Sequence, residues 1–229
     1  EEAGDYAHAE PLLKEAAASA SDPRVSDEVR ARTLMTIAKI ESNKRKFADA
    51  LDHARQAIAV AARAGRAGND AASEARRVIA ASLHGQDNSK EAEPFLRDAL
   101  ETDRSIYGDR HEAVLDDWLE IGDELTELSR FDEAVTALQN AVTLARELHG
   151  PVHSTVANAL QELSAATGYA GKFTESERLQ REALEVFEKV YGPDHHETIT
   201  ARGNLYWTLE REGRYQEALN GRLEAWQGA

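Results

Sequence analysis

Two short motifs in this chain contain residue types that zinc hydrolases use. They begin at His111 and at His196, and each continues with a glutamate, as in the pattern His-Glu-x-x-His. In that pattern two histidines one helical turn apart bind Zn²⁺, and the glutamate acts as the general base. The fifth positions here are Leu115 and Thr200, so the second histidine ligand is missing from both motifs. We therefore predict no zinc-hydrolase site.

Three histidines recur at intervals of 42 residues, at His111, His153 and His195. A zinc ion holds its nitrogen ligands at about 2.0–2.1 Å, whereas equivalent groups on successive packed helical repeats lie about 10 Å apart. The three histidines therefore cannot share one ion. We interpret them as loop residues that tie one repeat to the next.

The rest of the sequence gives no other indication of catalysis. The chain has no cysteine, which excludes thiol chemistry and thiolate metal sites. It contains neither a G-x-G-x-x-G motif nor a Walker A motif. No group of residues combines a base, a nucleophile and an orienting group. We therefore expect no enzymatic activity, no metal and no cofactor.

The acidic composition limits the classes of partner. The chain has 229 residues, with 27 Lys and Arg against 42 Asp and Glu, and a net charge of −15. It lacks the basic surface that binding to nucleic-acid phosphates or anionic lipid requires. No apolar run approaches the roughly 18 residues of a membrane span. We expect a cytoplasmic protein that binds neither nucleic acid nor a membrane.

The spaced histidines belong to a repeat of 42 residues. The glycines Gly108, Gly150 and Gly192 keep the same spacing, as do an aromatic residue and the small residue three positions after it. The aromatic residues are Phe47, Phe131, Phe173 and Tyr215, with Ser89 at the remaining position, and the small residues are Ala50, Ala92, Ala134, Ser176 and Ala218. Small side chains at a fixed position let two packed helices approach closely.

Each repeat is predicted to form two helices. Apolar residues recur every three or four positions, as at Trp118, Ile121 and Leu125, which is typical of amphipathic helices. Gly171 and Gly213, two positions before the aromatic residue, are expected to end the first helix. The pattern predicts an all-α chain of helix-turn-helix hairpins. The expected spans are an isolated second helix over 4–20 and repeats over 26–66, 70–109, 111–150, 153–192 and 195–229.

This pattern resembles the tetratricopeptide repeat, in the 42-residue form found in kinesin light chains and their bacterial relatives. Residues 192–196, Gly-Pro-Asp-His-His, match the G-P-D-H-P signature between repeats, and residues 213–218 match the turn and the start of the second helix. Asn204-Leu205 keeps part of the N-N-L-A signature, whereas residues 63–73 depart from the pattern. The resemblance implies one right-handed α-solenoid over residues 1–229, with about five and a half repeats. It also implies that the first helices line a concave groove.

The groove implied by the resemblance contains the candidate binding residues. Positions on each first helix opposite the apolar stripe carry almost no net charge, although the whole chain carries −15. Together with Asn204 of the N-N-L-A signature, these positions predict a peptide-binding site. Its residues are Arg32, Lys39, Arg77, Asp123, Asn158, Gln161, Tyr169, Asn204 and Trp207.

Three functional interpretations remain open. The first is a protein-interaction scaffold that holds a peptide or partner domain in the groove, through amide hydrogen bonds and an aromatic contact. The second is a regulatory or sensor region cut from a larger signalling protein, such as a bacterial serine/threonine kinase or a transcription regulator, with an intramolecular partner domain. The third is self-association through the ends of the solenoid, since terminal repeats normally need polar caps.

Overall fold

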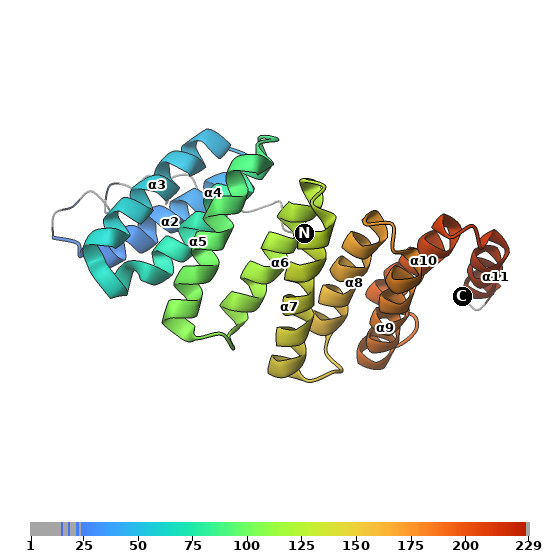
Figure 1. Cartoon of the computed structure of the whole chain (residues 1–229). Helices are drawn as coiled ribbons and strands as arrows, with labels where there is room; N and C mark the ends of the chain where they lie inside the picture. Colours follow the sequence, from blue (N-terminus) through green and yellow to red (C-terminus); the bar gives the residue numbers. More distant parts are fainter. Residues whose placement is uncertain (1–14, 16–17, 19–21, 23, 228–229) are drawn as a thin grey trace. The chain divides into compact units, whose positions relative to one another are not determined.

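The computed structural model describes residues 15, 18, 22 and 24–227 of the chain (Figure 1). The helix predicted over residues 4–20 lies outside these residues except at Glu15 and Ala18. All regular secondary structure in the described residues is helical, which confirms the predicted all-α chain of helical hairpins.

The helices alternate between a first and a second member of each hairpin. The first helices are α2 (Asp27–Asn43), α4 (Asn69–His84), α6 (Glu112–Glu127), α8 (Ser154–Tyr169) and α10 (His196–Arg211). The second helices are α3 (Phe47–Ala64), α5 (Ser89–Tyr107), α7 (Phe131–His149), α9 (Phe173–Tyr191) and α11 (Tyr215–Gln227). A short 3₁₀ helix, η2 (Gly65–Gly68), joins α3 to α4, in the segment where the sequence departs from the repeat pattern.

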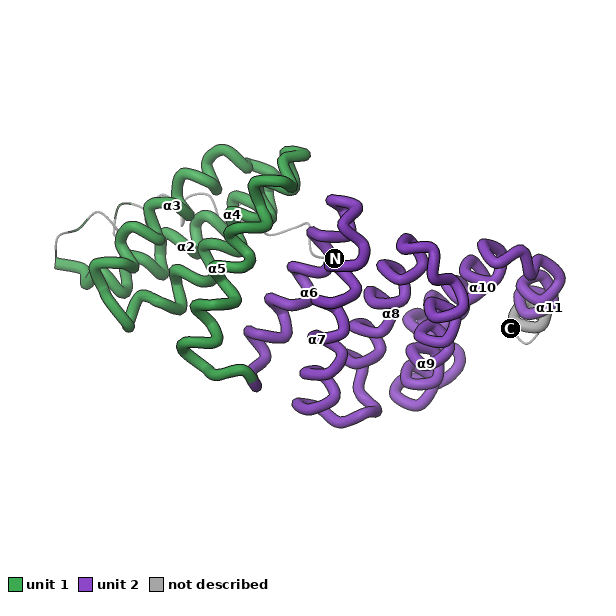
Figure 2. The backbone as a smooth tube through the Cα atoms, viewed as in Figure 1, with its two compact units in different colours: residues 1–109 green, residues 110–229 purple. Residues whose placement is uncertain are grey.

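The chain divides into two compact units, residues 1–109 and residues 110–229 (Figure 2). Unit 1 contains α2 to α5, and unit 2 contains α6 to α11. Within each unit successive helices pack side by side, and the first helices α2 and α4, and likewise α6 and α8, also contact each other. The single solenoid expected across both units stays a prediction.

The turn inside every hairpin has the same backbone conformation. The residue two positions before the start of the second helix has a positive φ, between 58° and 80°. These residues are Arg45, Asp87, Ser129, Gly171 and Gly213. In the hairpin of α8 and α9 the next residue, Lys172, donates its N–H to the carbonyl of Thr167 at 3.1 Å, which closes the Schellman motif that ends many helices.

The recurring histidines begin the first helices. His111, His153 and His195 each occupy the N-cap and accept a hydrogen bond through Nδ1 from the backbone N–H two residues later, at 3.1–3.3 Å. The rings of His153 and His195 also stack 4.3 Å from those of His149 and Tyr191 at the end of the preceding helix. His153 and His195 thus link the end of one hairpin to the start of the next within unit 2.

The small residues of the repeat let each hairpin pack tightly. Ala50, Ala92, Ala134 and Ala218 are fully buried, and Ser176 is nearly so. Gly122 of α6 lies so close to α7 that an added Cβ would stand 2.4 Å from Leu138 Cγ. Because such a contact is far inside van der Waals range, only a residue without a side chain fits there.

Candidate peptide-binding face

The predicted binding residues lie on the first helices of the two units. Three are in unit 1 and six are in unit 2. The unit-1 residues are Arg32 and Lys39 on α2 and Arg77 on α4, and the unit-2 residues are Asp123 on α6, Asn158, Gln161 and Tyr169 on α8, and Asn204 and Trp207 on α10. We call these two sets the unit-1 face and the unit-2 face.

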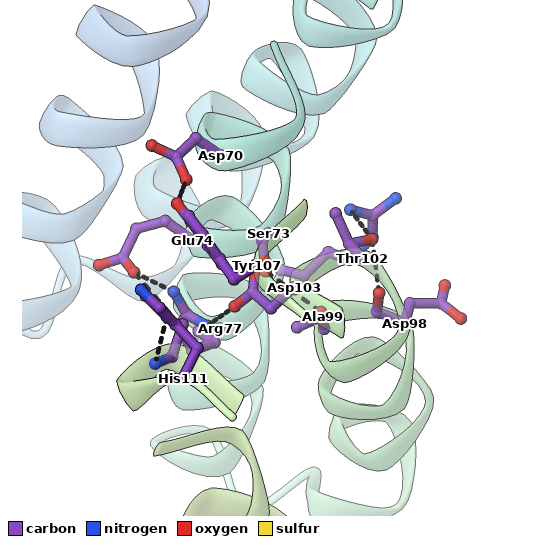
Figure 3. A network of polar contacts seen from close by, with 12 residues as sticks. Asp70, Ser73, Glu74, Arg77, Asp98, Ala99, Thr102, Asp103, Tyr107 and His111 are labelled. Carbon is purple, nitrogen blue, oxygen red and sulfur yellow. Dashed lines mark hydrogen bonds and ion pairs between the residues drawn. The ribbon is translucent and has the colours of Figure 1, made fainter. Parts of the chain in front are cut away.

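The unit-1 face is crossed by a network of ion pairs that links α2, α4 and α5. Figure 3 shows the part of this network around Arg77, Glu74 and Asp103. Lys39 of α2 binds Glu74 of α4. Arg77 of α4 binds Glu74 at 2.7 Å and also Asp103 of α5 at 2.7 Å. Burial raises the pKa of Glu74, but the hydrogen bonds from Lys39 and Arg77 outweigh it and hold that pKa below its usual value. The cations Lys39 and Arg77 are thus already neutralised within the unit.

A second group of contacts on the unit-1 face centres on Asp70, near the start of α4 (Figure 3). Asp70 accepts a hydrogen bond from the hydroxyl of Tyr107 at the end of α5 and lies 3.6 Å from Arg32 of α2. The hydrogen bond to the carboxylate raises the pKa of Tyr107 to about 12, because the bond favours the protonated phenol. Arg32, like Lys39 and Arg77, therefore links one helix to another.

Sequence reasoning missed the carboxylates of this network, although the repeat contains a signal for one of them. Asp103 is only 1% exposed and stands fourteen positions after Ser89, the residue that replaces the aromatic in its repeat. The equivalent positions of the other repeats with described side chains are Ala61, Ala145 and Phe187, all buried. A carboxylate at a position otherwise apolar requires a buried cation nearby, since an unpaired charge would be costly there.

The unit-2 face begins with two carboxylates on neighbouring helices. Asp123 of α6 is exposed, and its negative charge interacts electrostatically with the carboxyl group of Glu162 on α8. The surrounding protein and the negative charge of Asp123 together raise the pKa of Glu162 to about 7. Glu162 was not among the predicted residues. At neutral pH this edge of the face therefore carries less negative charge than its composition suggests.

Further along α8 the face presents amide groups. Asn158 is exposed, and no hydrogen bond or ion pair within the described residues uses its side chain. Gln161, one helical turn later, is half-buried, and its Nε2 is out of contact with water and has no acceptor among the described residues. Amide groups of this kind can both donate to and accept from a peptide backbone.

Two exposed aromatic rings complete the unit-2 face. Tyr169 at the end of α8 is 55% exposed and stacks on Phe131 of α7 with ring centroids 5.7 Å apart. Trp207 of α10 is 43% exposed, and the guanidinium of Arg211 lies 5.3 Å from its ring centroid. Asn204, three residues before Trp207, is exposed and lies on the same side of α10. Each ring thus contacts one neighbouring side chain and is partly exposed to solvent.

The structure therefore separates the predicted residues into two kinds. On the unit-1 face the predicted cations form ion pairs between helices, with Arg77 largely buried and Arg32 and Lys39 57% exposed, whereas the unit-2 face carries exposed amides and aromatic rings. Among the described residues no group of three or more His, Asp or Glu side chains is placed to hold a metal ion. None of the described helices has the length and apolarity that crossing a membrane requires.

The paired helices, the shared turn and the capping histidines define a helical-hairpin repeat protein. Models of the tetratricopeptide repeat family match residues 120–155 and 165–220. Similar solved structures confirm the predicted resemblance to the repeats of kinesin light chains.

Two of these structures cover nearly the whole chain. Kinesin light chain TPR-like repeats from Podospora anserina are 17% identical, with a TM-score of 0.77, over 88% of this chain and 95% of that one. BtubC (BKLC) from P. vanneervenii is 16% identical, with a TM-score of 0.80, over 97% of this chain and 91% of that one. At such identities the likeness concerns the fold.

A third structure is that of a Rap protein complexed with Competence and Sporulation Factor. It is 17% identical, with a TM-score of 0.59. The match covers 92% of this chain but only 56% of that protein. The search of curated proteins gave no match.

Proposed function

We propose that this chain is a protein-interaction module whose unit-2 face binds an extended peptide or a flexible segment of a partner protein. One observation carries the proposal. Within the described residues, the polar groups of the unit-1 face form ion pairs with one another, whereas on the unit-2 face the exposed amide of Asn158 makes no hydrogen bond and the rings of Tyr169 and Trp207 are 55% and 43% exposed.

The chemistry of the unit-2 face suits a peptide in extended conformation. The amides of Asn158 and Asn204 can bond to backbone N–H and C=O groups, which every peptide offers and which fix its direction. Tyr169 and Trp207 provide large rigid surfaces for side chains, and aromatic residues of this kind dominate binding energies at interfaces. A Rap protein of similar fold is known in complex with Competence and Sporulation Factor, which supports the more general proposal that this fold binds a partner.

Selection from a random peptide display library on the purified chain provides ligands for the test. Affinities of the selected peptides are then measured by isothermal titration for the wild type and for Asn158→Ala and Trp207→Ala. We expect each substitution to weaken binding by about tenfold or more, as for interface hot spots.

The matched control is Asn140→Ala, which removes an exposed amide from the second helix α7. It should leave the affinity unchanged. Peptides that bind the wild type and both unit-2 variants equally well would place the binding site elsewhere and refute the proposal.

A further inference from the structure

Helix α11 carries a row of exposed apolar side chains. Tyr215, Leu219 and Leu223 are 68%, 51% and 45% exposed, and their spacing of four residues places them on one side of the helix. Glu217, about 160° around the helix from Leu219 at 3.6 residues per turn, binds Arg181 of α9 at 3.1 Å. The row, which we call the α11 stripe, therefore lies on the side of α11 that faces away from α9.

The same side of the preceding second helix forms an interface. In α9 the positions equivalent to Leu219 and Leu223 are Glu177 and Arg181. Glu177 binds Arg214 at 2.6 Å, just before α11, and Arg181 binds Glu217 of α11. This side of a second helix is thus the one on which the next layer packs. In α11 leucines stand at these positions in place of the charged residues of α9, and burying a leucine side chain away from water lowers the free energy.

The surroundings of the α11 stripe carry no uncompensated charge among the described side chains. Glu217 is paired with Arg181 and Arg214, and Arg222 is paired with Glu210 at 3.0 Å. Next to the stripe, the amide of Gln216 donates to that of Asn220 at 2.9 Å. In a chain with a net charge of −15, most surfaces of two copies repel each other, but here two copies can approach without that repulsion.

We infer that the α11 stripe is the docking surface for a second copy of this chain. The stripe is symmetric about Leu219, with one apolar residue four positions before it and one four positions after it. Two α11 helices packed antiparallel therefore bring Leu219 against Leu219 of the second copy, and Tyr215 against its Leu223. Such self-complementarity is what a two-fold interface requires.

The expected dimer is weak. A single helical stripe buries less than the roughly 800 Å² per partner of standard stable interfaces. We therefore expect a dissociation constant of about 10–1,000 μM, so that monomer and dimer exchange over an accessible range of concentration.

Sedimentation velocity of the full chain from about 10 to 500 μM tests the association. The weight-average sedimentation coefficient should rise with concentration for the wild type and for the control Ile199→Glu, which alters a side chain that is 55% exposed on α10. It should stay at the monomer value for Leu219→Glu, whose fold is verified by circular dichroism. A wild type that remains monomeric throughout, or a Leu219→Glu variant that associates like the wild type, would overturn the inference.

Cysteine cross-linking tests the antiparallel arrangement, because the chain has no cysteine of its own. Under mild oxidation Leu219→Cys should form a disulfide-linked dimer, since residue 219 meets itself across the two-fold axis. An equimolar mixture of Tyr215→Cys and Leu223→Cys should form more cross-linked dimer than either variant alone. Ile199→Cys is the control for random collisions. Cross-linking of Leu219→Cys no faster than that of Ile199→Cys would contradict the antiparallel dimer.

Discussion

The hydroxyl of Tyr206 on α10 donates a hydrogen bond to the backbone carbonyl of Gly221 on α11 at 2.8 Å. The tyrosine stands where the other repeats have Ala38, Ala80, Gly122 and Ser164. A Cβ on Gly221 would lie 2.4 Å from the tyrosine ring. In the hairpin of α10 and α11 the first helix therefore carries a large side chain, Tyr206, where the other repeats have small residues. Gly221 on the second helix has no side chain, so the two helices still approach closely.

The contact between Tyr206 and Gly221 predicts that the substitution Gly221→Ala destabilises the wild type but stabilises a Tyr206→Ala variant. Gly221→Ala forces a Cβ against the ring, which costs about 1–3 kcal/mol by overpacking and regains about 1 kcal/mol through helix propensity. The net result should be a loss of stability of up to about 2 kcal/mol. In a Tyr206→Ala background the clash is gone, and the same substitution should stabilise by about 0.5–1 kcal/mol. Urea unfolding of the four proteins measures both values.

The control for this pair is Gly203→Ala, because Gly203 is helical and an added Cβ there meets nothing within 4 Å. It should stabilise the chain by about 0.5–1 kcal/mol through helix propensity. If Gly221→Ala stabilised the chain as much as Gly203→Ala does, the tight contact would be disproved.

The ion pair of Arg77 and Asp103 predicts a loss of stability when one partner is removed. Asp103 is 1% exposed and the side chain of Arg77 is 17% exposed. Asp103→Ala leaves the guanidinium of Arg77 with Glu74 as its remaining carboxylate partner, so the loss should be about 1–3 kcal/mol, less than for a buried pair whose cation loses its only partner. Chemical denaturation should show this loss, and the double variant Arg77→Leu, Asp103→Leu should recover most of it, because it leaves no unpaired charge.

Asp98→Ala is the matched control for Asp103, because it removes an exposed carboxylate from the same helix α5. It should change stability by less than about 0.5 kcal/mol. Equal effects of the two substitutions would mean that the pair with Arg77 contributes nothing specific.

The N-cap role of His195 predicts that substituting His195 lowers stability more than substituting the adjacent His196. His195 accepts the N–H of Glu197 and stacks on Tyr191, so His195→Ala should cost about 0.5–2 kcal/mol, as other lost N-caps do. His195→Ser should recover part of this loss, since serine restores the acceptor but not the stacking. The side chain of His196 is 85% exposed, and His196→Ala should change little. Thermal unfolding of the three variants distinguishes these outcomes.

The raised pKa of Glu162 predicts a pH dependence of stability. A carboxyl group whose pKa is about 7 in the folded chain and about 4.3 in the unfolded chain binds protons more tightly when folded. It therefore favours the folded state fully below about pH 4, and this contribution is lost as the pH rises through 7. The effect should be under about 1 kcal/mol, because solvent screens this exposed group.

Urea unfolding between pH 5 and 8.5 tests this dependence. Glu162→Gln should be less sensitive to pH than the wild type over this interval, because it lacks the titrating group. Asp123→Asn should lower the pKa of Glu162, which carboxyl ¹³C NMR measures directly. A titration of Glu162 unaffected by Asp123→Asn would show that the two carboxylates do not interact.

The sequence by itself determined the hairpins and their turns. The spacing of 42 residues locates every turn, and Gly171 and Gly213 mark two of them. Arg45, Asp87 and Ser129 take the same left-handed conformation without being glycine. Turns and caps depend on residues within about six positions of each other, so a local pattern is sufficient to predict them.

Only the tertiary structure decided which of the predicted binding residues form ion pairs with residues of other helices. The sequence predicts that Lys39 and Arg77 are cations that line the groove. Their ion-pair partners Glu74 and Asp103 lie 35 and 26 residues further along the chain, so no local pattern indicates these pairs. Trp207 has the same position in its repeat as Lys39, eight residues before the aromatic residue, but it carries no charge to neutralise and is exposed, as is Asn158. A charge is neutralised by whatever side chain the packed helices bring within a few ångströms, and that distance is set by the packing of whole hairpins, which the spacing of residues along one helix does not contain.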